Sequence, residues 1–201
     1  MQILLAANSL LTAINRDFWT YAAMILDESK RRELEEACRR VGVNVSRVGP
    51  QPLVSAVAFV SILRTARAEE GADFVHHAGY FAGGNAARRV EANRPDPNAG
   101  AMRLVAEAAR ACDGMQFDAR AQSAARFELS VTSKVVIDRA VIDFAHGFVK
   151  GAATRLNEGS RPTLKAAVSE GGKAWAVSVD WAPAEAGGTA PATRAGKRPR
   201  R

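Results

Sequence analysis

The sequence predicts an α+β fold in which helices pack on one face of an antiparallel sheet made of two hairpins, with an N-terminal helical segment before them. The first observation is residues 141–181, which join a long apolar helical stripe to two alternating segments around a glycine turn. The second is residues 72–131, where a glycine-containing helix is again followed by two alternating segments. The chain therefore repeats the order of helix and then hairpin.

The first half of the chain is predicted to be helical. Its apolar residues recur at steps of three and four, and the charged run after Asp27 keeps a narrow apolar face until Gly42. Pro52 is placed near the first turn of a further helix, where proline is tolerated. Residues 3–26 are expected to form one or two packed helices. The other expected helices are residues 27–41, 53–70, 72–92 and 101–112, with a linker at 43–49 and a loop at 93–100.

The second half supplies the strands and the last helix. Asp138 is the expected N-cap of that helix, and Gly159 is its expected end. Gly171 and Gly172 are placed in the turn of the second hairpin, because glycine readily adopts the positive φ angles of tight turns. The expected strands are residues 115–119, 127–131, 164–168 and 175–181.

Glycines occur inside two of the predicted helices. Gly147 and Gly151 are one turn apart in the last helix, and Gly79, Gly83 and Gly84 lie in the helix at 72–92. An interior glycine costs roughly 1 kcal/mol relative to alanine, so a packing reason is expected for each. We predict that these two helices pack closely at Gly79, Gly83, Gly147 and Gly151, within one chain or across a homodimer.

Composition indicates one domain with tails. The chain has 201 residues, of which 47% are apolar, and this is ample for a hydrophobic core. The formal net charge is +7, but residues 183–201 hold five basic groups and one acidic group, so the rest carries only +3. We expect an N-terminal helical segment at 1–49, an α+β domain at 50–182 and a disordered basic tail at 183–201. We expect this tail to be a solubilising end, with contact to nucleic acid or acidic partners as the alternative, and we expect no nucleic-acid binding elsewhere in the chain.

The cysteines and the N-terminus indicate a cytoplasmic protein. Cys38 and Cys112 have no spacing typical of a metal site, and both are expected to be reduced, buried thiols. The apolar N-terminus lacks the basic start of a secretory signal, and polar residues interrupt it before it is long enough to span a membrane.

Candidate site residues lie mainly on the two glycine-containing helices. Asp143 and His146 are three residues apart, so the carboxylate could orient the imidazole toward a ligand; a histidine paired with an acid for structural reasons is the alternative. His76 and His77 point in different directions, so at most one can share a site with His146, and no metal site is expected. Five aromatic residues are candidates for an apolar ligand pocket or for plain core: Phe144, Phe148, Tyr80, Phe81 and Trp175.

The order of these elements resembles the four-vinyl reductase domain family. The residues that carry the resemblance are FAHGFVKG at 144–151, VSE at 168–170 and GKAWAV at 172–177, with GYF at 79–81 and RR at 88–89 upstream. The resemblance covers residues 50–181 and implies the fold described above, which is also similar to subunits of the TRAPP vesicle-tethering complex. Where relatives carry cysteines this chain has Asp143 or Phe144, Gly171 and Trp175, so thiol or metal chemistry is not implied.

The resemblance implies a homodimeric domain that binds a small molecule, either hydrophobic or tetrapyrrole-like. Two alternatives stay open. One is an enzyme or accessory subunit in the biosynthesis of bacteriochlorophyll, another tetrapyrrole or a related cofactor, and the other is a non-catalytic assembly scaffold. The sequence shows no nucleophile–base pair, phosphate-binding loop or redox-cofactor motif, so it assigns no catalytic residue and no cofactor.

Overall fold

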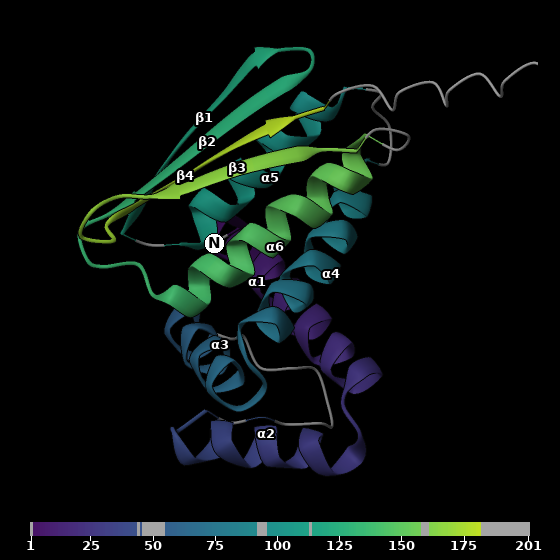
Figure 1. Ribbon diagram of the computed structural model, residues 1–201, viewed down its shortest axis with the longest axis vertical. Helices are drawn as coiled ribbons and strands as arrows, with labels where there is room; N and C mark the ends of the chain where they lie inside the picture. The colour runs from purple at the N-terminus through teal and green to yellow at the C-terminus, as the bar shows by residue number, and fades with distance from the viewer. Residues whose placement is uncertain are drawn as a thin grey trace, which may run out of the picture.

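The computed structural model describes residues 2–43, 45, 55–91, 96–112, 114–157 and 161–181. Within them the helices cover one face of a four-stranded antiparallel sheet, which confirms the predicted α+β class (Figure 1). The helices are α1 (Gln2–Ile25), α2 (Glu28–Arg40), α3 (Ala56–Glu70), α4 (Ala72–Glu91), α5 (Pro97–Ala111) and α6 (Arg139–Leu156). The strands are β1 (Met115–Ser123), β2 (Arg126–Ser133), β3 (Thr163–Val168) and β4 (Ala174–Asp180).

Polar side chains fix where several helices begin. The N-cap is Asp27 for α2, Ser55 for α3, Asp96 for α5 and Asp138 for α6. Each accepts a hydrogen bond from an amide of the first turn, which has no partner within the helix itself. Asp138 is therefore the N-cap of the last helix, as the sequence predicts.

Two helix starts differ from the prediction. Helix α3 begins after its N-cap Ser55, whereas the predicted helix began at residue 53, and residues 53 and 54 lie outside the described ranges. Helix α5 begins at Pro97, inside the stretch 93–100 that was predicted to be a loop. The prediction was wrong there because Asp96 is an N-cap and proline suits the first helical turn.

The sheet has the order β1-β2-β4-β3, and every neighbouring pair is antiparallel. The two predicted hairpins are thus joined through β2 and β4, where Leu129 is paired with Val177. Side chains alternate between the two faces, so the buried members of both strands point toward the helices. In the second turn Gly171 and Gly172 have φ angles of 86° and 67°, as the glycine pattern predicts.

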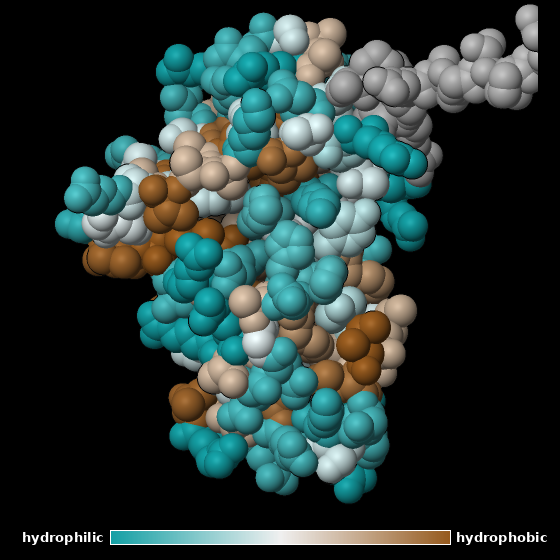
Figure 2. Space-filling model, viewed as in Figure 1, coloured by the Kyte–Doolittle hydropathy of each residue, from teal (hydrophilic) through white to brown (hydrophobic). Residues whose placement is uncertain are grey.

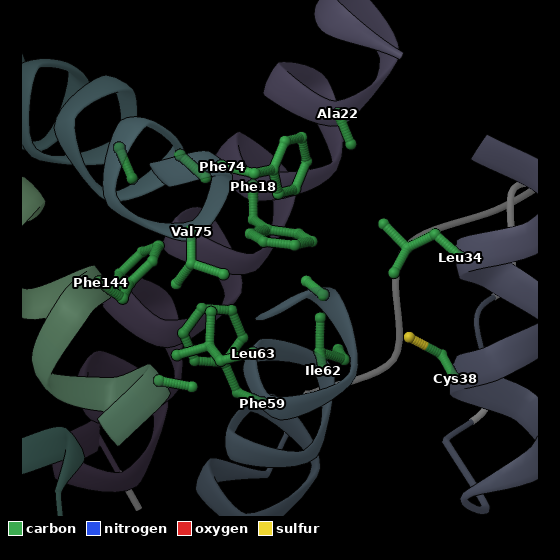
Figure 3. Close-up of a cluster of buried hydrophobic side chains, with 14 of the residues drawn as sticks. Phe18, Ala22, Leu34, Cys38, Phe59, Ile62, Leu63, Phe74, Val75 and Phe144 are labelled. Atoms are coloured by element: carbon green, nitrogen blue, oxygen red, sulfur yellow. The ribbon is translucent and has the colours of Figure 1, made fainter. Parts of the chain in front are cut away.

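Buried side chains form two main clusters. One lies among α1, α2, α3, α4 and α6 and is shown in Figure 3, where Phe18 is surrounded by other aromatic rings. Phe18 meets Phe59 and Phe74 edge to face, with ring centroids 6.3 and 6.0 Å apart. Leu34 and Cys38 attach α2 to this cluster. The other cluster lies between the inner face of the sheet and helices α5 and α6.

Helices α4 and α6 touch through their glycines within one chain. These are Gly79 and Gly83 of α4 and Gly147 and Gly151 of α6. A Cβ atom placed on any of the four would lie 1.9–2.2 Å from a backbone carbonyl oxygen of the other helix, far inside van der Waals contact. Gly84 differs, because its Cβ would lie 3.9 Å from the nearest such oxygen.

Some predictions fall on residues outside the described ranges. These are Gly159, most of the linker at 43–49 and the tail at 183–201. Helix α6 itself ends at Leu156, with Asn157 as its C-cap, which is before the predicted end. In the described part of the chain, no helix is long and apolar enough to cross a membrane. Cys38 is buried and Cys112 partly buried, and neither forms a disulfide.

Candidate functional site

A cavity of about 550 Å³ lies between the inner face of the sheet and the helices. Its volume falls within the roughly 300–1,000 Å³ that is usual for small-molecule pockets. Residues of α1, α3, α5, α6, β1, β2 and β4 line it, and almost all of them are apolar. The arrangement suits an apolar molecule enclosed by the sheet on one side and helices on the others.

Secondary-structure periodicity explains which side chains reach this cavity. Helix α5 turns one stripe toward it at helical spacing, and α6 turns another, of which Phe144 and Phe148 also border the contact with α4. The strands contribute residues from the face of the sheet that points toward the helices. The stripe of α5 is Ala101, Leu104, Val105 and Ala108, and that of α6 includes Ala145, Phe148, Val149 and Ala152.

The cavity opens where α3 begins and where the chain passes from β2 into α6. Val57 and Val135 line it although their exposed fractions are 78% and 69%, so they form its rim. Figure 2 shows apolar surface at the end of the sheet near the β3–β4 turn. The exposed Val168 is the last residue of β3, and the exposed Val136 lies beside Gly172 of that turn. Arg64 is the one charged residue among the described residues that line the cavity.

The predicted site residues divide into two groups. Phe144, Phe148 and Trp175 line the cavity. Tyr80 and Phe81 of α4 do not line it; Tyr80 is 38% exposed, and Phe81 packs beside the ring of Tyr21.

Asp143 and His146 also lie outside the cavity wall, although both belong to α6. The Asp143 carboxylate accepts a hydrogen bond from Arg67 Nε at 2.8 Å, and it lies 3.3 Å from Arg139 Nε. The pair with Arg67 ties α3 to α6, whereas the pair with Arg139 lies within α6, so the structure gives Asp143 partners other than the imidazole.

His146 faces His76 across the contact between α4 and α6, with ring centroids 5.2 Å apart. Burial lowers the pKa of His76, and the neighbouring His146 imidazole lowers it further. Burial also lowers the pKa of His146, with Lys150 as the next cause and Asp143 opposing it. Both imidazoles thus favour the neutral form. Among the described residues no group of three side chains is suited to hold a metal ion.

Sequence reasoning missed the walls that come from α1, α3 and α5. The α5 stripe was visible as a pattern, but the pattern alone indicates an apolar face and not what that face meets. Cys112 and Met115, at the junction of α5 and β1, also line the cavity. No signal in the sequence distinguished them from ordinary core residues.

The sequence matches no known family profile. No curated protein is similar to it in sequence. Solved structures of H-NOX domains are similar in fold. One from a study of heme distortion in the H-NOX family has 13% identity and a TM-score of 0.56, and the match covers 87% of this chain and 94% of that one.

Two further H-NOX structures give the same result. The Fe(II) unliganded H-NOX protein from K. algicida has 10% identity and a TM-score of 0.55, with 84% and 95% of the two chains covered. A mutant H-NOX from T. tengcongensis has 12% identity and a TM-score of 0.54, with 84% and 94% covered. At these identities the likeness concerns the fold alone.

The resemblance to the four-vinyl reductase family was wrong, because the similar structures are H-NOX domains. The residues that suggested it are glycines at 147 and 151, a glycine turn at 171–172 and alternating apolar residues. The structure assigns these residues to a helix contact, a hairpin turn and a core. Such residues report how elements pack and carry no information about a shared reaction.

Proposed function

We propose that this chain is a small-molecule-binding domain that holds a hydrophobic ligand between its sheet and its helices. The observation that carries the proposal is the cavity of about 550 Å³ with its apolar lining. Phe144, Phe148 and Trp175 supply aromatic surface in it, which suits an apolar ligand.

The energy of an empty cavity supports an occupant. Cavities left in apolar cores destabilise proteins because the atoms that line them lose van der Waals contacts. The apolar side chains that line this cavity lose such contacts when it is empty. Water is a poor substitute because apolar walls offer it few hydrogen bonds. An apolar ligand would restore the missing contacts.

Two of the similar H-NOX structures come from studies of heme and porphyrin distortion, so heme is the first ligand to consider. Heme iron is held in proteins by histidine, cysteine thiolate, methionine or tyrosine. The described residues that line this cavity include no histidine and no tyrosine. All three histidines of the chain, His76, His77 and His146, lie elsewhere in the structure.

Two sulfur atoms are the remaining candidates for an iron ligand. Burial raises the pKa of the Cys112 thiol, which disfavours the thiolate form that binds iron. Met115 also lines the cavity, but thioether ligands to heme typically act together with a histidine. The lining therefore does not fit a heme held through an iron–protein bond. We propose instead an organic ligand held by apolar contact.

The test is to identify what the protein carries when it is purified from the cells that make it. We expect an organic extract of the purified protein to contain one apolar compound in near-stoichiometric amount, detected by mass spectrometry. The control is the same extract from a variant whose cavity is filled, such as Ala108→Trp. Equal amounts of the compound in both extracts, or no compound in either, would contradict the proposal.

A further inference from the structure

We propose that the ligand is a monoanionic amphiphile, with a carboxylate end bound by Arg64 at the mouth and an apolar chain inside the cavity. This inference rests on the proposed function, because it assumes that the cavity holds a ligand. It adds the chemical class of that ligand and the residue that selects it.

Arg64 is placed where the end of a bound ligand would be. Arg64 belongs to α3 and lines the cavity, yet its side chain is 63% exposed, so it lies at the boundary between the apolar interior and solvent. Val57, at the rim, and Ser61 precede it on the same helix. The Ser61 hydroxyl donates to the Val57 carbonyl oxygen at 3.1 Å, so this hydroxyl is already engaged by the backbone. Arg64 is thus the charged group that a ligand end meets when its chain is inside.

Asp138 fixes the orientation of the Arg64 guanidinium. Its Nε donates to Asp138 Oδ2 at 2.6 Å, while Asp138 Oδ1 accepts a hydrogen bond from the Ala140 amide at 2.8 Å. Asp138 is held in place as the N-cap of α6, so it holds the guanidinium at the mouth. A guanidinium has five N–H donors, and the bond to Asp138 uses the one on Nε. The η nitrogens can therefore receive a carboxylate.

Charge sets the class of ligand. A single guanidinium matches one carboxylate. A ligand with several negative charges would require several cations, and Arg64 is the one cation among the described residues that line the cavity. The Asp138 carboxylate partly neutralises the charge of Arg64 and repels the carboxylate of the ligand. The cavity therefore prefers a ligand with an anionic end over one with a neutral end only moderately. A partly exposed charge-assisted hydrogen bond contributes roughly 1–1.4 kcal/mol, which corresponds to about a five- to tenfold change in affinity.

The chain offers a matched control for Arg64. Arg67 lies one turn further along α3 and forms the equivalent ion pair with α6, in which its Nε donates to Asp143 at 2.8 Å. Arg67 does not line the cavity. Arg67→Gln removes the same charge and the same kind of helix-to-helix ion pair, but it leaves the mouth of the cavity unchanged.

The experiment compares decanoate with decan-1-ol, which have the same chain but different ends, by isothermal titration calorimetry. We expect the unmodified protein to bind both, and Arg64→Gln to weaken decanoate roughly five- to tenfold with little effect on decan-1-ol. Arg67→Gln is expected to leave both affinities unchanged. Thermal melts verify that both variants are folded.

Two failures of this experiment are distinguishable. If decan-1-ol and decanoate bind but Arg64→Gln weakens neither, or Arg67→Gln weakens decanoate equally, the role of Arg64 is refuted and the cavity proposal stands. If neither compound binds the unmodified protein, the proposed function itself is contradicted for ligands of this size.

Discussion

Gly83→Ala is expected to lower the free energy of unfolding by about 2–3 kcal/mol, because the added methyl group has no space in the contact between α4 and α6. Its Cβ would lie 2.0 Å from the Phe148 carbonyl oxygen, and a backbone atom cannot move aside as a flexible side chain can. Helices α4 and α6 would have to move apart, and the close packing between them would be lost. This loss exceeds the roughly 1 kcal/mol that alanine normally gains over glycine within a helix.

The neighbouring residue is the control. Gly84 is also in α4, but its Cβ would lie 3.9 Å from the nearest atom, so alanine fits there. Gly84→Ala should raise stability by up to about 1 kcal/mol through helix propensity. In thermal melts we expect Gly83→Ala to lower the Tm by about 5–10 °C and Gly84→Ala to raise it slightly. Similar melting temperatures for the two variants would rule out close backbone contact between α4 and α6.

Ala108→Trp is expected to weaken the binding of an apolar ligand at least about tenfold, because the indole occupies space that the ligand needs. Ala108 lines the cavity from α5, and the void beside it can accept a large side chain. The same substitution in a filled core would cause overpacking, which typically costs about 1–3 kcal/mol. Here we expect unchanged or slightly higher stability in the absence of ligand.

Ala106→Trp is the matched control for this variant. Ala106 lies on the same helix and is exposed, and it does not line the cavity. Calorimetric titration with decan-1-ol should therefore give the original affinity for Ala106→Trp and a much lower one for Ala108→Trp. If Ala108→Trp lowers the stability of the protein without ligand, the space beside Ala108 is already filled by core side chains and the cavity is refuted.

The elements with strong local signals could be predicted from the sequence. Helix α6 has an apolar stripe and the N-cap Asp138, and the second hairpin has alternation and the paired glycines of its turn. The start of α5 could not be predicted with the same rules. Pro97 and its neighbours are typical both of a loop and of the first turn of a helix. The helix is identified by the hydrogen bond from the Asn98 amide to the Asp96 carboxylate, which is visible in the structure and not in the sequence.

The site was predicted only in part because α6 has two different faces. Phe144 and His146 were assigned to one site. Residues two apart on a helix are rotated by about 200° around its axis, so their side chains point to nearly opposite sides. Phe144 lines the cavity, whereas His146 faces α4 and the His76 ring. The walls from α1 and α3 depend on how distant segments meet, which the pattern within one segment does not encode.

The central claim is that an apolar molecule occupies the space between the sheet and the helices, and methyl NMR during titration with decan-1-ol tests it most directly. We predict chemical-shift changes concentrated at the methyl groups of Leu104, Val105 and Val149, which line the cavity. The methyl groups of Leu34 and Val75 belong to the helical cluster and should be unaffected. Shift changes confined to methyl groups outside the cavity, or spread equally over both sets, would contradict the claim.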